Sequence, residues 1–543
     1  MIIEKDIKYA GDARIALKSG IDKVAAAVKV TLGPQGRNVV IERMMGVPHV
    51  TKDGVTVARS IDLADPVEQL GAQMVLQAAT RTAEQAGDGT TTATILTQAM
   101  VQEGFRLVSN GANPMELRKG IEKAVKSIVA HLEKIRIPVA YEDVQTISNI
   151  GTIAANNDRS IGNLIAEAMQ KVGKLGTITI DDSKTSETTI HTVEGMQFDR
   201  GWVSPYFVNT PKGEADFENP YILVYDRTIS SLKTLVPLLE RVTQAGRSLV
   251  IISDNVDGDA LTGLVINKMQ GRIKVCAVKA PGFGDRRKDI LQDIAVLTGA
   301  TFIAAELNRN LETLTMQDLG TATRVLITKE NTIISGGAGT KESLDQRKGE
   351  IQAQLATVTS DYDREKLQER LSKLAGGVGS IRVGAGSESE LKERKDSVED
   401  ALNATKAAIE EGIVAGGGLA LIRCGQAVEE TLGFPNDDQV QGAELVFKVL
   451  KTPFTQILEN AGLEPRSIFD KVLKGADDFG YNSATERFSN LIADGVVDPK
   501  KVVRIALENA ASVAGTVLTT EATITDVRNE MYYKLRMPAM GGE

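Results

Sequence analysis

Apolar side chains recur at helical spacing through the first quarter of the chain, which predicts a mainly helical region over residues 1–134. A first helix is expected at 12–30, and its apolar face comprises Ile15, Ile21, Val24, Ala25 and Val28. Another should begin at Asp65-Pro66-Val67-Glu68, because Asp is a good cap and Pro is favoured at the first helical position. Further helices are expected at 90–109 and from Asn113-Pro114 onward.

Short β-branched runs predict strands beside these helices. Residues 38–42 predict a short strand, and residues 50–57 predict a second strand interrupted by a turn. After Pro138 the pattern changes, and a helix at 161–172 followed by a strand at 176–182 predicts a small connecting unit.

From about residue 192 to 335 strands alternate with helical segments, which is typical of an α/β domain. Its expected strands include 221–225, 249–252 and 275–278. Two charged helical segments between 341 and 374 should pair as an antiparallel hairpin. Because the pattern is mainly helical again from about 397, we expect the α/β domain to be inserted into a helical one.

Composition narrows the class of protein. A chain of 543 residues favours about three or four domains. With 72 acidic and 63 basic residues its net charge is -9, which disfavours a nucleic-acid partner. Cys276 and Cys424 lack CxxC spacing, so a disulfide framework and a cysteine zinc site are excluded. No long apolar run or signal pattern is present, and we expect a cytoplasmic protein.

The segment AGDGTTTAT at 86–94 carries the clearest chemistry. Its two glycines allow a close backbone approach to a ligand, and the N-terminus of a helix beginning at Thr90 to Thr92 would favour an anion. Asp88 could hold Mg²⁺ against a phosphate chain. A tight turn followed by a threonine-capped helix explains these residues equally well. The chain has no GxxxxGK[ST] motif, so a Walker-type loop is not the alternative.

Six motifs in one order give the chain a resemblance to the group I chaperonins, the GroEL family. They are TLGPQGRNV at 31–39, TKDGVTVA at 51–58, AGDGTTTAT at 86–94, KAPGFGDRR at 279–287, EDALNATKAAIEEGIVAGGG at 399–418 and VVDPKKV at 496–502. The resemblance covers essentially the whole chain. It implies a ring-forming, multidomain α+β and α/β protein. The implied domains are a mainly helical equatorial domain at 1–134 and 411–543, a small hinge domain at 135–191 and 378–410, and an inserted α/β apical domain at 192–377.

The resemblance also implies an ATP site made from distant segments. Its nucleotide-binding residues would be Thr31, Leu32, Gly33, Pro34, Lys52, Asp88, Gly89, Thr90, Thr91, Thr92, Gly417, Asn482, Ser483, Ala484 and Asp498. Asp88 would ligate Mg²⁺, and the backbone carbonyls of Thr31 and Lys52 could hold K⁺. Asp53 and Asp400 would position the attacking water, with Asp400 arriving when the hinge closes.

Each of these acids also has a structural explanation. Asp53 precedes a glycine as in a common turn, Asp400 could be a helix cap, and Asp498-Pro499 is a common helix start. The three histidines, His49, His131 and His191, lie far apart in the sequence and give little support to a metal site or a catalytic triad.

In the family, an apolar rim of the apical domain binds non-native polypeptides and a GroES-type co-chaperonin. The matching residues here are Trp202, Tyr206, Phe207, Val236, Leu239, Leu261, Val265 and Ile266. Two helices, at 235–240 and 261–267, should form the groove. Without the resemblance, these positions would be read as ordinary core residues.

Two departures from the family concern assembly. Thr455 stands where the family often has an arginine that joins two rings, whereas Glu464 keeps its acidic character. The chain ends at Arg536-Met537-Pro538-Ala539-Met540-Gly541-Gly542-Glu543 and nearly lacks the family's glycine-methionine tail. We expect a homo-oligomer of heptameric rings, with a double ring less certain.

The sequence therefore predicts an ATP-dependent folding chaperone that encloses substrates in a ring cavity. One alternative is a ring-forming ATPase that acts as a scaffold for a dedicated partner. Another is a small-molecule kinase that uses the same phosphate site.

Overall fold

The chain folds into two compact units, the second inserted within the first. The computed structural model describes residues 4–42, 48–173, 177–183, 185–304, 311–358, 360–376 and 378–527. The first unit comprises Met1–Ala166 and Ala385–Glu543, and the second comprises Glu167–Gly384. The predicted hinge residues divide between the two units, so the three-domain boundaries stay a prediction.

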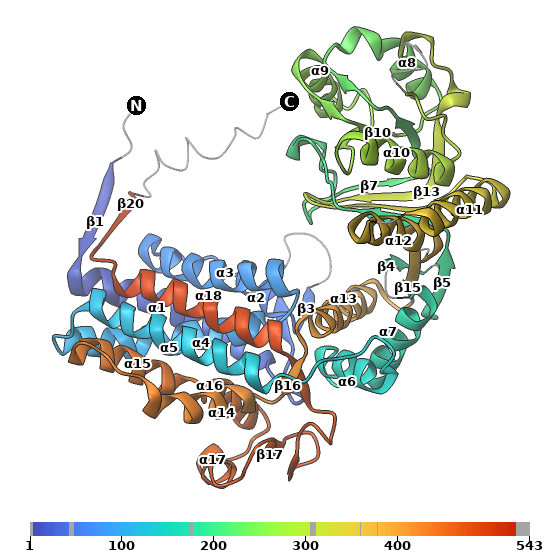
Figure 1. Ribbon diagram of the computed structural model, residues 1–543. Helices are drawn as coiled ribbons and strands as arrows, with labels where there is room; N and C mark the ends of the chain where they lie inside the picture. Colours follow the sequence, from blue (N-terminus) through green and yellow to red (C-terminus); the bar gives the residue numbers. More distant parts are fainter. Residues whose placement is uncertain are drawn as a thin grey trace. The chain divides into compact units, whose positions relative to one another are not determined.

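The first unit is mainly helical (Figure 1). Its helices are α1 (Ala10–Val28), α2 (Gly54–Arg59), α3 (Pro66–Ala86), α4 (Thr90–Ser109), α5 (Pro114–Ile135), α6 (Val144–Ala154), α13 (Glu388–Glu411), α14 (Leu419–Val428), α15 (Asp437–Val449), α16 (Thr452–Asn460), α17 (Pro465–Leu473) and α18 (Lys500–Leu518). Helix α7 (Arg159–Val172) crosses the boundary between the units. The core of the first unit forms where α18 packs on α3, α4 and α5, and α18 is buried along most of its length.

Small residues set the close spacing of these helices. A Cβ atom on Gly20 of α1 would lie 1.8 Å from the carbonyl oxygen of Glu68 in α3, and one on Gly71 of α3 would lie 2.1 Å from that of Leu17. Glycine at both positions is therefore required for α1 and α3 to approach so closely. This packing places the end of α3 and the start of α4 beside the turn that follows α1.

Among the residues that the structure describes, four strand pairs complete the first unit. The strands are β1 (Lys5–Tyr9) with β20 (Ala522–Asp526), β2 (Val39–Ile41) with β3 (His49–Thr51), β16 (Ile413–Ala415) with β19 (Val497–Pro499), and β17 (Phe479–Asn482) with β18 (Arg487–Asn490). All four are antiparallel pairs. The pair β1 and β20 joins segments from near the two ends of the chain.

The second unit is an α/β structure around a seven-stranded mixed sheet with strand order β12-β10-β8-β13-β14-β6, in which β7 also pairs with β13. Its strands are β6 (Gly195–Phe198), β7 (Ala215–Glu218), β8 (Tyr221–Val224), β10 (Leu249–Ser253), β12 (Val275–Lys279), β13 (Gly320–Ile327) and β14 (Thr332–Gly337). Strands β8, β10 and β12 are parallel, and helices α8 (Val236–Gln244) and α9 (Gly258–Met269) connect them.

The remaining elements extend this unit. Strands β9 (Thr228–Ile229) and β11 (Asn255–Val256) form a short parallel pair, and β4 (Thr177–Asp182), β15 (Val378–Val383) and β5 (Thr189–Val193) form a three-stranded sheet. Helices α10 (Gly284–Thr298), α11 (Lys341–Thr357) and α12 (Asp361–Gly376) complete the set, and α11 and α12 pair as predicted. The expected combination of a mainly helical part with an inserted α/β part is confirmed.

Three local predictions are wrong. Ile15 is 71% exposed, because the buried face of α1 runs through Leu17 and Ile21, and Ile15 points to the other side of the helix. Residues 55–57 lie in helix α2, which starts when Asp53 accepts hydrogen bonds from the N–H groups of Val55 and Thr56. Thr90 to Thr92 form the first turn of α4 and do not cap it, because the capping position belongs to Gly89.

Candidate functional site

The turn after α1 forms one wall of the candidate site. Gly33 has a φ of +87°, a conformation that favours glycine, and a Cβ there would lie 3.1 Å from Ile457 of α16. The side chain of Asn460, at the end of α16, donates hydrogen bonds to the carbonyl of Lys29 at 2.9 Å and to that of Leu32 at 2.8 Å. Helix α16 therefore holds the turn that carries the predicted residues Thr31, Leu32, Gly33 and Pro34.

The loop between α3 and α4 forms the second wall. Gly87 and Gly89 have φ angles of +74° and +86°, and no side chain caps the N-terminus of α4. The backbone N–H groups of the first turn are consequently available to an anion. The hydroxyl of Thr91 lies 3.4 Å from that of Thr31, so the two walls meet at this point.

Asp53 and Gly54 bring a third segment against the same helix end. A Cβ on Gly54 would lie 2.4 Å from the hydroxyl oxygen of Thr91 and 3.0 Å from that of Thr90. Asp53 caps α2, which fits its structural explanation, and also lies close enough to Asp88 and Asp400 to affect the pKa of each. Lys52 is half-buried beside it.

Asp400 approaches the loop of Asp88 from helix α13. It lies in the middle of that helix, so the explanation that it is only a cap is excluded. One turn later, the side chain of Asn403 packs on Gly87, where a Cβ would approach the Cβ of Asn403 to 2.3 Å. Asp400 thus already lies near Asp88 in this structure, and its arrival on hinge closure stays a prediction.

Three carboxylates of this region, those of Asp88, Asp400 and Asp498, have raised pKa values. Burial raises the pKa of Asp88 to about 6, with a further contribution from Asp53 and an opposing hydrogen bond from the Gly89 N–H. Burial, together with the charges of Asp88 and Asp53, raises the pKa of Asp400 well above its ordinary value. Burial and the charge of Asp88 raise the pKa of Asp498 to about 7. Uncompensated negative charge in one place favours a bound cation.

No protein cation neutralises these groups in the part of the chain that the structure describes. Neither Asp53, Asp88, Asp400 nor Asp498 forms an ion pair with a lysine or arginine there. Nor do the described residues contain three His, Cys, Asp or Glu side chains placed to hold a metal ion by themselves.

Strand pairing places Asp498 beside the glycine turn at 416–418. Asp498 lies opposite Val414 in the β16–β19 ladder, and the Gly416 N–H donates to the carbonyl of Val496 at 2.9 Å. Asp498 belongs to β19, and α18 starts two residues later, so it is not the cap of that helix. Gly417 has a φ of +64°, and a Cβ there would have its nearest neighbour at 3.8 Å, which leaves room for a ligand.

The turn after β17 supplies the last predicted residues. The side-chain oxygen of Asn482 accepts hydrogen bonds from the N–H groups of Ala484 at 3.1 Å and Thr485 at 3.3 Å, and its amide donates to Asp494 at 3.2 Å. The side chain of Asn482 thus shapes the turn that contains the buried Ser483. Because the Asn482 side chain already makes these hydrogen bonds, we expect the turn, and not this side chain, to contact a nucleotide base.

Sequence reasoning missed Asn460, Asn403 and Ile457. Asn460 closes an amphipathic helix in the sequence Glu459-Asn460-Ala461-Gly462, which is typical of a helix end and gives no sign of a partner over four hundred residues away. No sequence signal identifies Asn403 as the neighbour of Gly87 either. Both contacts depend on helix packing.

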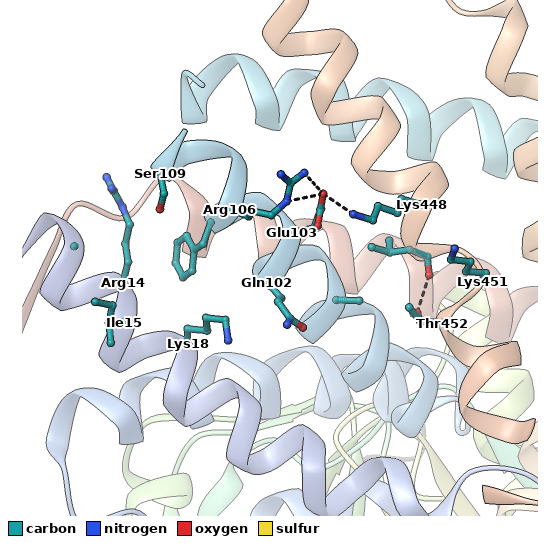
Figure 2. A pocket seen from close by; sticks show the side chains of 14 residues that line it. Arg14, Ile15, Lys18, Gln102, Glu103, Arg106, Ser109, Lys448, Lys451 and Thr452 are labelled. Atoms are coloured by element: carbon teal, nitrogen blue, oxygen red, sulfur yellow. Dashed lines mark hydrogen bonds and ion pairs between the residues drawn. The ribbon is translucent and has the colours of Figure 1, made fainter. Parts of the chain in front are cut away.

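A recess of about 600 Å³ lies elsewhere in the first unit, between α1, α4 and the α15–α16 junction. Figure 2 shows Glu103 within it, bonded to Arg106 and to Lys448 at 2.8 Å. Lys18 and Lys451 also line it. None of the predicted site residues does, so the recess is separate from the candidate site.

In the second unit, the predicted apolar rim is only partly at the surface. Tyr206, Val236 and Ile266 are exposed, at 59%, 38% and 47%. The half-buried members, Trp202, Leu239, Leu261 and Val265, pack against the core. Helices α8 and α9 both pack against the turn at Leu232–Thr234, as expected of two walls of one surface.

Phe207 does not fit the predicted rim. It is 0% exposed and belongs to the core cluster of the second unit, so a docked chain could not reach it in this structure. The reason is local, because the short helix Pro205–Phe207 turns Tyr206 outward and Phe207 inward.

The assembly residues have local roles. Glu464 caps α17 by accepting hydrogen bonds from the N–H groups of Arg466 and Ser467, and Thr455 is half-buried on α16. The predicted short tail lies outside the described residues.

Among the described helices, none is long and apolar enough to cross a membrane.

Comparison with known proteins assigns the fold and the family. Residues 24–528 match the model of the TCP-1/cpn60 chaperonin family. A crystal structure of the chaperonin gp146 from the bacteriophage EL 2 (Pseudomonas aeruginosa), determined in the presence of ATP-BeFx, is similar with a TM-score of 0.67. It is 22% identical in sequence, and the match covers 95% of this chain and 98% of that one.

Proposed function

The chain belongs to the TCP-1/cpn60 chaperonin family, and we propose that it is an ATP-driven folding chaperone. The observation that carries the proposal is the meeting of Asp88 with Asp400, from segments over three hundred residues apart, beside an uncapped helix N-terminus. Phosphate binding needs the helix end, and phosphoryl transfer needs charges held in alignment. The solved chaperonin structure with an ATP analogue supports nucleotide binding.

The residues divide into three roles at the nucleotide. The N–H groups at the start of α4 and the turn at Gly33 would hold phosphate oxygens, and the segments at Gly417, 482–484 and Asp498 would hold the nucleoside. Asp88 would hold Mg²⁺, which would supply positive charge against the negative charge of the phosphates. We also propose that the backbone carbonyls of Thr31 and Lys52 bind K⁺.

Asp53 and Asp400 would act on the attacking water. Each carboxylate can accept a hydrogen bond from water and orient it toward the terminal phosphate. Asp400 belongs to a different part of the chain from the phosphate-binding walls, so a movement of α13 would change its distance from the nucleotide and with it the rate of hydrolysis.

Substrate binding belongs to the second unit in this proposal. The exposed Tyr206, Val236 and Ile266 would bury apolar segments of non-native polypeptides without selecting a sequence. A GroES-type co-chaperonin would compete for the same surface. Heptameric rings and a cytoplasmic location also belong to the proposal, and native mass spectrometry would count the subunits and so separate a single ring from a double ring.

The decisive variant is Asp400→Ala. Because Asp400 comes from α13 and is not one of the residues proposed to hold the phosphates, this change should leave nucleotide binding intact and lower phosphate release roughly hundredfold. Isothermal titration with ADP and Mg²⁺ measures binding, and a phosphate sensor measures hydrolysis. Glu410→Ala, which removes an exposed carboxylate from the same helix, should hydrolyse at the wild-type rate. Wild-type hydrolysis by Asp400→Ala would show that the assigned role is wrong.

Refolding of a denatured test enzyme separates a general chaperone from a dedicated scaffold. A general chaperone should raise the yield with ATP and a co-chaperonin, and a scaffold should not.

A small-molecule kinase would transfer phosphate to an acceptor, whereas the proposed ATPase releases free phosphate.

A further inference from the structure

The C-terminal end of α13 is tied to two other helices through the side chain of Lys500. This residue begins α18, and its side chain is only 7% exposed. Its ammonium group bonds Glu133 near the end of α5 and Glu411 at the end of α13, the latter at 3.1 Å. Its backbone N–H also donates to the carbonyl of Gly412 at 3.0 Å. One residue therefore fixes three helices to one another.

The charged side chains around Lys500 also pair with one another. Arg504, one turn further along α18, bonds both oxygens of Glu411, at 2.5 and 3.1 Å, and pairs with Glu508 at 2.8 Å. Burial acts to raise the pKa of Glu411, but the hydrogen bonds from Arg504 and Lys500 outweigh it and hold that pKa below its ordinary value. A buried ammonium group is tolerated when it is paired in this way.

The junction lies between the two elements that carry candidate site acids. Asp498 precedes Lys500 by two residues, and Asp400 lies eleven residues before Glu411 on the same helix. At 1.5 Å per residue, the distance along α13 is about 16 Å, so a tilt of about 4° at the Glu411 end displaces Asp400 by about 1 Å. A misplacement of about 1 Å can lower a rate roughly hundredfold when catalysis depends on alignment.

We propose that Lys500 is a positioning residue for nucleotide hydrolysis, which holds the end of α13 through Glu411 and Glu133 and so sets the place of Asp400 beside Asp88. The inference rests on the proposed function, because it requires Asp400 to act on the attacking water. It goes further in assigning this work to a residue that lies outside the nucleotide site.

Apolar contacts hold α13 independently of Lys500. Ala407 of α13 packs with Ala86, Val502 and Ile505, and Asn403 packs on Gly87. Glu411 also keeps both of its bonds to Arg504 when the Lys500 side chain is shortened or made neutral. A Lys500 variant should therefore fold, but the end of its helix α13 should be held less closely to α18.

The test is Lys500→Met, alone and combined with Asp400→Ala. Alone it should lower kcat for ATP hydrolysis roughly tenfold and change the Kd for ADP less than about twofold, because only alignment is lost. In the Asp400→Ala background it should cause no further loss, since the residue acts through Asp400. Lys500→Arg should restore most of kcat. Lys501→Met, which removes the neighbouring and more exposed pair with Glu410, is the matched control and should stay near wild type.

An equal loss in the Asp400→Ala background, a parallel loss of ADP binding, or an unchanged kcat would overturn the inference. If Lys500→Met does not fold, Glu133→Gln takes its place, because the Glu133 side chain is 52% exposed and its loss leaves Lys500 bonded to Glu411. It should give a smaller loss of kcat with unchanged ADP binding, and an unchanged kcat would again overturn the inference.

The two levels of the proposal fail differently. If Asp400→Ala loses hydrolysis while Lys500→Met keeps it, only the positioning role is wrong. If Asp400→Ala hydrolyses at the wild-type rate, the role of Asp400 in the proposed function is wrong, and the inference about Lys500 falls with it.

Discussion

At the scale of single residues, the candidate site brings together acidic side chains that repel one another when they are ionised. Asp88, Asp400 and Asp498 all have raised pKa values, caused first by burial and then by neighbouring carboxylates. A group whose pKa is higher in the folded chain than in the unfolded chain binds more protons when folded. The chain without nucleotide and metal should therefore lose stability as these acids ionise.

Asp498 offers the clearest test of this effect. Its pKa is about 7 in the fold against 3.8 for the free group, so its favourable contribution is complete below pH 4 and is lost as pH rises through 7. At about 1.4 kcal/mol per pKa unit, the loss is at most roughly 4 kcal/mol. Asp498→Asn, which stays neutral, should raise the free energy of unfolding at pH 8 relative to wild type and much less at pH 5. Urea unfolding in EDTA without nucleotide measures both.

An equal effect of Asp498→Asn at pH 5 and pH 8 would show that charge is not the cause. Saturating nucleotide and Mg²⁺ serve as the control, because a bound cation should remove most of the difference between the two proteins at pH 8.

At the scale of elements, turns of the candidate site are held in place by helices from elsewhere in the chain. Asn460 of α16 holds the turn after α1 by two hydrogen bonds, and Asn403 of α13 covers Gly87. The loop that contains Asp88 is thus shaped both by its own glycines and by the helix that carries Asp400. Changes in this loop should affect α13.

Gly87→Ala tests the contact between the loop and α13. The added methyl group would lie 2.3 Å from the Cβ of Asn403, at a position with a φ of +74°. Gly462 has the same φ of +74° and no atom within 4 Å, so Gly462→Ala carries the backbone strain alone. We expect Gly462→Ala to cost about 1 kcal/mol of stability and Gly87→Ala clearly more. Urea unfolding measures this, and hydrolysis should fall only in Gly87→Ala.

Equal losses of stability in the two alanine variants would mean that Asn403 and α13 yield freely to the added methyl group. Unchanged hydrolysis in Gly87→Ala would indicate that the place of α13 does not depend on this contact.

At the scale of the whole molecule, the two units have separate cores, and our proposal assigns them separate tasks. The candidate nucleotide site belongs to the first unit, and the surface with Tyr206, Val236 and Ile266 belongs to the second. A ligand that binds the first unit stabilises that unit directly by mass action.

Hydrogen exchange with and without ADP and Mg²⁺ tests this division. Protection should increase most in the turn at 29–37, in the first turn of α4 and around 416–418, because these backbones would contact or enclose the nucleotide. The sheet of the second unit, including β10 and β12, should change little. Added protection confined to the second unit would contradict the placement of the site.

The sequence by itself determined those features that depend on near neighbours. Asp65 and Pro66 begin α3 as predicted, since a cap acts within one turn, and apolar spacing located long helices such as α1 and α4 and buried strands such as β8, β10 and β12. Family motifs that occur in order along the chain were enough to predict the family, which the comparison confirmed.

Only the tertiary structure decided which of several possible faces and partners each residue took. Ile15 and Phe207 are both apolar, yet the packing of the surrounding elements exposes one and buries the other. The contact of Asn403 with Gly87, and the ion pair of Lys500 with Glu411, join segments that share no local signal. Such contacts form when whole helices pack together. Burial of apolar surface from many residues stabilises this packing, and the polar residues on the same helices are then held in place.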